Sequence, residues 1–231
     1  MSPPKTLQAL GSLLLAGLSA CGGGQTPATA PHTPPPSGHG TGTPTTTPTG
    51  STGSSSTPAG VSACVPSGRG RDYQVGPGTG QLAALDQVPW ESLQAGDTVR
   101  IFYRAAPYAG KFMLSGVGTA AAPIRVCGVR GPAGQRPVVE GRDAVSRRGL
   151  AYGHPLHESR SLVVIKPLAS SPTAWTDVPA HLQIDGLELR GAQPDHTFTD
   201  SHGVVQRYAA FGACVWIERG HHISLVDNHI H

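Results

Sequence analysis

Two eight-residue segments near the carboxyl end of the chain repeat one pattern of apolar positions, and this repeat limits the possible folds most. Residues 182–189 read LQIDGLEL and residues 223–230 read ISLVDNHI, so that apolar residues match at the first, third and last places. Gly186 in one copy meets Asp227 in the other, at a place that suits a tight bend. Each copy also follows another apolar run, SLVVIK or ACVWIE. The repeating unit is therefore strand, turn, strand, one-residue bend, strand.

This unit predicts a right-handed parallel β-helix, a solenoid in which each coil adds one strand to every sheet. Successive coils stack about 4.8 Å apart, and like residues lie above like residues inside. We expect Asn228 to occupy the bend, since Asn tolerates left-handed backbone conformations. The sequence thus predicts an all-β fold in the form of an incomplete solenoid.

Further short β-rich runs, separated by Gly and Pro, extend this pattern toward the amino end. Including the repeat, they cover residues 97–103, 111–116, 123–129, 137–141, 161–166, 181–191, 213–220 and 221–231. The chain has 31 Gly and 22 Pro, which favours many turns over a helical bundle. Before these runs, residues 82–99 space their apolar side chains near helical intervals, with Pro89 interrupting. They predict a short amino-terminal capping helix that is broken at the proline.

Two stretches carry a resemblance to a known group of proteins. Residues 93–131, LQAGDTVRIFYRAAPYAGKFMLSGVGTAAAPIRVCGVRG, resemble the first coils of secreted bacterial right-handed parallel β-helix proteins of the pectin lyase-like fold, which include polysaccharide lyases. GACVWIERGHHISLVDNHIH, at 212–231, is similar to their interior coils. The likeness covers residues 73–231 and implies a β-helix. It implies no reaction, because the catalytic residues of such lyases lie in later coils.

The resemblance also bears on where the chain stops. Members of this family continue for several coils before a cap, whereas this sequence stops at His231 inside a third strand. We therefore expect a truncated product. The alternative is that another chain or a second copy covers the open end, since solenoids need capped ends.

The amino-terminal segment indicates export. Residues 1–20 form a short apolar signal peptide. Leu18-Ser19-Ala20-Cys21 resembles the lipobox of bacterial lipoproteins, which implies acylation of Cys21, anchoring in a lipid bilayer and a place in the cell envelope. The alternative is an ordinary signal peptide with a cysteine by chance. Residues 22–60 contain no Asp, Glu, Lys or Arg, so residues 21–62 are interpreted as a disordered linker before a β-helix domain at 63–231.

Two long excursions interrupt the otherwise tight coils, at residues 168–180 and 192–211. We expect them to flank one sheet as walls of a groove, which is where the resembling family holds extended polysaccharides. The second excursion supplies the candidate groove residues Asp195, His196, Asp200, His202, Arg207 and Tyr208. The first four offer oxygen and imidazole groups for acid–base work or for zinc or manganese, and the alternative is a solvated loop with turn-capping Asp residues. The last two are candidates for contact with an anionic sugar, and the alternative is a surface Arg and a packed Tyr.

The remaining cysteines and histidines are interpreted as structural. A disulfide between Cys64 and Cys127 would join the cap to an early coil outside the cytoplasm, and Cys214 is expected in the core. Four histidines crowd the carboxyl end: His221, His222, His229 and His231. Because neighbours in a strand point to opposite faces, we expect them to spread out as exposed polar residues. No metal site is assigned from the sequence, and the cofactor is left open.

These observations predict a surface-anchored lipoprotein whose domain binds or processes extracellular polysaccharide. Processing would be of the lyase or glycoside hydrolase kind, although no pair of carboxylates is spaced for hydrolysis. The alternative is a non-catalytic glycan-binding or adhesive module. The net charge of +3 is spread along the chain, which argues against a nucleic-acid partner.

Overall fold

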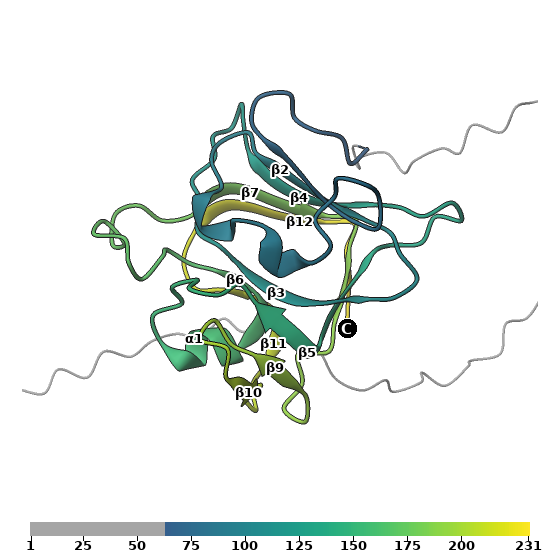
Figure 1. Cartoon of the computed structure of the whole chain (residues 1–231). Coiled ribbons are helices and arrows are strands. Elements are labelled where there is room, and N and C mark those ends of the chain that lie inside the picture. The colour runs from purple at the N-terminus through teal and green to yellow at the C-terminus, as the bar shows by residue number, and fades with distance from the viewer. Residues whose placement is uncertain (1–62) are drawn as a thin grey trace, which may run out of the picture.

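The computed structural model describes residues 63–231, which form an all-β unit of curled, mainly parallel sheets (Figure 1). The predicted signal peptide, Cys21 and the linker lie outside the described residues. Within residues 63–231, no helix is long and apolar enough to cross a membrane. The strand-rich character expected from the composition is therefore observed.

One sheet contains five parallel strands and lies along the top of the view in Figure 1. Its order is β1 (Asp72–Val75), β2 (Thr98–Phe102), β4 (Ile124–Val129), β7 (Ala180–Asp185) and β12 (His221–Val226). Every neighbouring pair is parallel. From β2 onward, the chain therefore returns to this sheet after passing through other strands.

The other strands form a second, strongly bent surface. They are β3 (Tyr108–Leu114), β5 (Val138–Ser146), β6 (Ser161–Ile165), β8 (Glu188–Arg190), β9 (Thr197–Thr199), β10 (Val205–Arg207), β11 (Ala213–Ile217) and β13 (His229–Ile230). Strand β3 pairs with β5 along its first part and with β6 along its second part. Strands β11 and β13 pair in parallel with β6 and β8. The β9–β10 hairpin, which is antiparallel, attaches to the end of β5.

The sequence repeat is confirmed by the pairing register. Ile223 pairs with Leu182 in the first sheet, and Ile230 pairs with Leu189 in the second. The bend between the two halves falls at Gly186 in one copy, with φ of 70°, and on the aligned Asp in the other. Like residues are thus stacked on like residues, as the alignment predicted.

The role predicted for Asn228 is wrong, because the left-handed residue of that bend is Asp227, with φ of 51°. Instead, Asn228 bonds to the preceding copy of the repeat through its side chain. Its Oδ1 accepts from the backbone N–H of Leu187 at 3.1 Å, and its Nδ2 donates to the carbonyl of Ile184 at 2.8 Å. An amide can do both at once because it carries a donor and an acceptor.

The predicted capping helix is replaced by two separate 3₁₀ turns, η1 (Leu85–Gln87) and η2 (Trp90–Ser92). Val88 between them is extended, because the ring of a following proline disfavours the helical region. The segment still packs as expected of a cap. Trp90 is fully buried, stacks on Phe112 with ring centroids 4.2 Å apart, and donates its indole N–H to the carbonyl of Leu85.

A single short α-helix occurs within residues 63–231, and it was not predicted. Helix α1 (Pro155–Ser159) begins after His154, whose side chain accepts a hydrogen bond from the backbone of Leu156. Proline at the first helical position is typical of a helix start. The helix lies within residues 147–160, and this excursion forms one wall of the pocket described below.

A disulfide bond joins the start of the described chain to the first sheet. Cys64 and Cys127 are joined by a disulfide with their Cα atoms 5.6 Å apart. Cys127 lies in β4 and is fully buried, so residues 63–71 are held against the strands. Cys214 lies in the core, as expected from its apolar neighbours.

Candidate functional site

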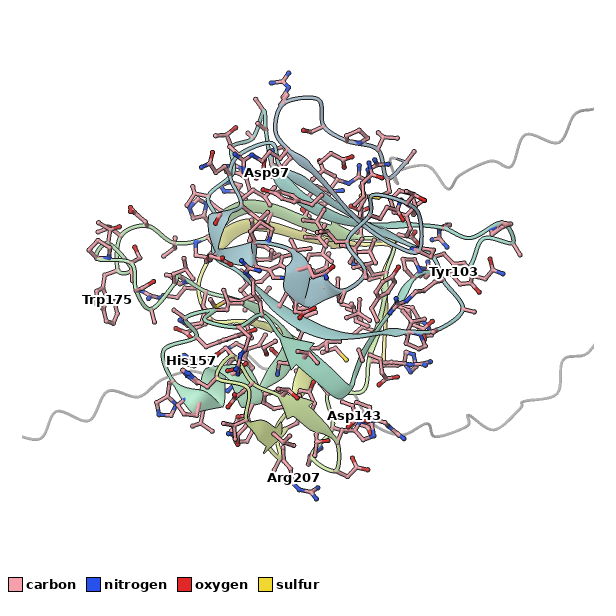
Figure 2. The ribbon with its side chains drawn as sticks, in the orientation of Figure 1. Asp97, Tyr103, Asp143, His157, Trp175 and Arg207 are labelled. Carbon is pink, nitrogen blue, oxygen red and sulfur yellow. A yellow bond between two sulfur atoms is a disulfide. The ribbon has the colours of Figure 1, made fainter. Side chains whose placement is uncertain are left out.

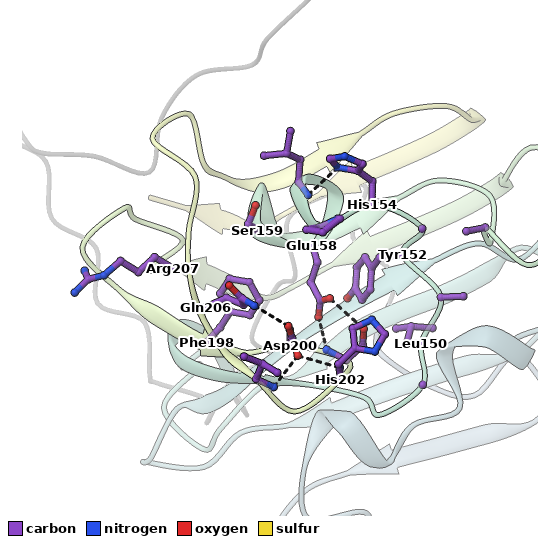
Figure 3. A pocket seen from close by; sticks show the side chains of 18 residues that line it. Leu150, Tyr152, His154, Glu158, Ser159, Phe198, Asp200, His202, Gln206 and Arg207 are labelled. Atoms are coloured by element: carbon purple, nitrogen blue, oxygen red, sulfur yellow. Dashed lines mark hydrogen bonds between the residues drawn. The ribbon is translucent and has the colours of Figure 1, made fainter.

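A pocket of about 750 Å³ lies between the 147–160 excursion and the β9–β10 hairpin (Figure 3). Its lining combines apolar side chains with polar ones. The apolar group includes Leu150, Tyr152, Leu156 and Phe198, and the polar group includes His154, Glu158, Asp200, His202, Gln206 and Arg207. Mixed pockets of this size are the usual form of a small-ligand site.

Glu158 ties the two walls of the pocket together. It lies on α1, is 5% exposed, and accepts hydrogen bonds from both the backbone N–H and the hydroxyl of Ser201, at 2.8 Å and 3.1 Å. Ser201 belongs to the turn of the β9–β10 hairpin. The carboxylate therefore fixes the distance between helix and hairpin.

Asp200 caps the turn of the hairpin. Its carboxylate accepts from the backbone N–H groups of His202 and Val204, at 2.9 Å and 2.8 Å, and from the side-chain amide of Gln206 at 3.1 Å. Burial alone would raise the pKa of Asp200, but these hydrogen bonds lower it. This residue matches the turn-capping alternative rather than a free acid or base.

Beneath the pocket lies a buried cation, Lys111, which the sequence analysis missed. Its side chain is fully buried, its Nζ donates to the carbonyl of Glu158 at 2.5 Å, and the same atom lies 3.5 Å from the ring centroid of Phe198. Burial lowers the pKa of Lys111 to about 7, while the nearby carboxylates of Glu158 and Asp200 act in the opposite direction. Lysine in an otherwise apolar strand, as in KFML, is the signal that would have pointed to it.

The prediction that Tyr208 presents its ring to a sugar is wrong. The residue is 3% exposed, its hydroxyl donates to the carbonyl of Gly141 at 2.9 Å, and its ring packs on Phe198 with centroids 4.8 Å apart. Burial raises the pKa of Tyr208 far above its usual value. The packed-tyrosine alternative is the one observed, whereas Arg207 is exposed and lines the pocket.

The four predicted ligands of the second excursion do not meet at one point. Asp195 is exposed, and His196 lines a different hollow, with Nδ1 2.8 Å from the carbonyl of Gly191 and Nε2 2.9 Å from Nη2 of Arg142. Strand β9 separates this pair from Asp200 and His202, and an extended strand carries residues apart by about 3.3 Å each. Among the described residues, these four form no group of converging ligand atoms.

The predicted groove between two excursions is also wrong. Ala169 is the only residue of the 168–180 loop that lines the pocket. Figure 2 shows Trp175 of that loop and Arg207 of the hairpin on different sides of the molecule. Trp175 is 86% exposed, with the guanidinium of Arg219 4.7 Å from its ring centroid. The second wall is formed instead by the 147–160 excursion. The sequence signal that could have indicated it is Pro155 after His154, because proline is typical of the first helical position.

The carboxyl-terminal histidines do not spread out as expected but form two groups. His221 and His222 join His181 from the neighbouring strand, and His229 and His231 join Glu188. In the first group, burial and the two neighbouring imidazoles lower the pKa of His181. In the second, Glu188 is also bonded to Arg190 at 3.0 Å.

Comparison with known proteins adds no relative. No family model matches the chain, and neither curated proteins nor solved structures give a significant match.

Proposed function

We propose that residues 63–231 form the first coils of a right-handed parallel β-helix that binds anionic extracellular polysaccharide in the pocket between α1 and the β9–β10 hairpin. Support for the fold comes from the parallel order of the five-stranded sheet and from the in-register repeat of β7–β8 under β12–β13. The observation that carries the function is the open pocket of about 750 Å³ whose lining includes an exposed arginine, Arg207. Arg pairs with carboxylates through two parallel N–H bonds, which suits a uronate.

The pocket supports binding rather than turnover. Hydrolysis of a glycoside requires one carboxylic acid and one free carboxylate at the bond to be cleaved. Here Glu158 is bonded to Ser201, and Asp200 is bonded to two backbone N–H groups and an amide. Both carboxylates hold the walls in place, so the arrangement favours the glycan-binding alternative over a hydrolase.

The proposed place of this activity is the cell envelope. Acylation of Cys21 would hold the chain on a membrane, and the linker of residues 21–62 would carry the binding domain outward. The Cys64–Cys127 disulfide supports an extracytoplasmic location, because such bonds persist in oxidising compartments.

The test is a binding measurement with two polysaccharides of equal length, one a polyuronate and one neutral. We expect the polyuronate to bind and the neutral glycan to bind at least about tenfold more weakly, because only the former engages Arg207. Arg207→Ala should remove that preference. The matched control is Arg69→Ala, an exposed arginine outside the pocket lining, which should change nothing.

A second variant separates this site from the other exposed surface. Trp175→Ala removes the aromatic side chain of the 168–180 loop without touching the pocket. Retention of polyuronate binding in Trp175→Ala together with its loss in Arg207→Ala would support the pocket. Loss of polyuronate binding in Trp175→Ala with retention in Arg207→Ala would refute the pocket as the site. Failure of the native chain itself to bind the polyuronate would refute the proposed function.

A further inference from the structure

We propose that His181, His221 and His222 form a binding site for a divalent transition-metal ion at the start of β7 and β12. One imidazole nitrogen from each of these residues lies within 4.8 Å of the other two. The site lies on the five-stranded sheet, which contributes no residue to the pocket lining. It is independent of the proposed polysaccharide function.

The three rings lie close enough together to share one ion. His181 and His222 stack with ring centroids 4.4 Å apart and planes 10° apart, and the His221 ring stands edge-on to both. Nδ1 of His221 lies 2.7 Å from Nδ1 of His222. Two nitrogens that bind one tetrahedral ion at about 2.0–2.1 Å are about 3.3 Å apart. The spacing between His221 and His222 is shorter than this value, and the other pairs lie within 4.8 Å. Because the His181 and His222 rings are stacked nearly parallel, the rings must rotate to turn all three nitrogens toward one ion.

The backbone at this site is strained, and the strain is what assembles the ligands. His181 and His222 both have positive φ, 51° and 55°, which is uncommon for residues other than glycine. In a regular strand, His221 and His222 would point to opposite faces. The left-handed residue breaks this alternation and turns both rings toward His181. Strained conformations of this kind cluster at functional sites.

The same strain occurs at equivalent places in neighbouring strands. The residues on either side of His181 pair with those on either side of His222: Ala180 with His221 and Leu182 with Ile223. The two left-handed histidines are therefore stacked one above the other. A repeated, costly conformation that places imidazole over imidazole is better explained by a shared ligand than by the bend alone, for which glycine would serve.

The surroundings leave room for a water or a further ligand. A shallow hollow of about 250 Å³ adjoins His181 and His222, and its other side is formed by Thr119, Ala120 and Pro123. His221 and His222 are exposed, so an ion can enter from solvent. Three imidazoles with one open position form a donor set that suits zinc, copper or nickel better than calcium or magnesium.

The second histidine group is the weaker candidate. Glu188 accepts a hydrogen bond from Arg190, whose guanidinium also binds Glu140. A metal ion at Glu188 would have to compete with this arginine for the carboxylate. This group contains two histidines, His229 and His231, at a different strand from the first group. Variants of these two histidines therefore serve as a control for the first group.

The test is calorimetric titration of the untagged full chain with zinc sulfate. The key variant is His181→Asn with His222→Asn, because Asn tolerates the left-handed backbone and removes the imidazole. We expect this variant to lose one zinc equivalent or to bind it at least about tenfold more weakly, since even changes outside the ligand shell cost 10–100-fold. Near-ultraviolet circular dichroism should show that the fold is retained.

The control variant is His229→Ala with His231→Ala, which leaves the proposed site intact. It should keep the zinc equivalent that the Asn variant loses. Zinc binding that is equal in the native chain and the Asn variant would overturn the proposal. Loss of that equivalent in the His229 and His231 variant would also overturn it, by placing the ion at Glu188.

Discussion

The carboxylate of Glu158 accepts two hydrogen bonds from Ser201, and this contact joins the two walls of the pocket. One residue lies on the short helix α1 and the other in the hairpin turn, and both are at most 5% exposed. Neither element is stabilised by length, since α1 has five residues and an isolated helix of that size is marginal. The pocket therefore depends on this contact more than on either element.

Glu158→Ala is expected to lower the free energy of unfolding by about 1–3 kcal/mol, because it leaves the buried N–H and hydroxyl of Ser201 without their acceptor. Urea unfolding followed by fluorescence measures this change. Glu91→Ala is the control: its carboxylate bonds to Arg147 but is about one-third exposed, so the change should stay below about 1 kcal/mol. Equal losses in the two variants would contradict the role given to Glu158.

The buried amino group of Lys111 predicts that stability rises with pH above neutrality. Its pKa is about 7 in the folded chain and near 10.5 when unfolded. Between these values the unfolded chain binds one more proton than the folded one, so raising the pH favours folding, by at most about 1.4 kcal/mol per pH unit. Asp200, which faces it and whose pKa is lowered by its hydrogen bonds, stays ionised over this range and adds no slope.

Lys111→Met tests this prediction. Urea unfolding at pH 7, 8 and 9 should show a rising free energy of unfolding in the native chain and a flatter dependence in the variant, where the titrating group is gone. Lys166→Met is the comparison variant: burial also lowers the pKa of that lysine, which lies beside Glu218, so its removal should flatten the dependence in the same direction. Identical slopes in the native chain and Lys111→Met would show that the buried amino group is not responsible.

The strands were predictable because their signal is local. Alternating apolar residues between Gly and Pro are read directly from the chain, and the repeat of 182–189 at 223–230 even fixed the register of β12 on β7. The pocket was not predictable to the same degree. It depends on contacts such as Glu158 with Ser201 and Lys111 with Glu158, which join residues far apart in sequence and leave no periodic pattern.

The histidine group was missed for a different reason. Neighbouring side chains point to opposite faces only where the backbone is extended, whereas His222 is left-handed. A sequence that reads HHISLV gives no sign of this, because positive φ is uncommon for residues other than glycine even though His is enriched there. The error therefore lies in one torsion angle, which reverses the direction of one side chain and gathers the cluster.

That torsion angle allows a last prediction, that His222→Gly stabilises the chain without metal and destabilises it with metal. A left-handed backbone costs a residue with a side chain about 1–2 kcal/mol, and glycine avoids most of this cost. In the presence of a chelator, the variant should therefore unfold at a higher urea concentration than the native chain. At zinc concentrations about 100 times the dissociation constant, the native chain should gain about 2.7 kcal/mol and the variant much less, so their order reverses.

His221→Gly is the matched control, because His221 is not among the residues with positive φ. There glycine relieves no strain and increases the entropy of the unfolded chain, so the variant should be less stable than the native chain with chelator as well as with zinc. Reversal by zinc in His222→Gly but not in His221→Gly would show that the strained torsion is maintained for the ion. If His222→Gly is less stable than the native chain in chelator, the left-handed conformation costs nothing, and the argument from strain to a metal site fails.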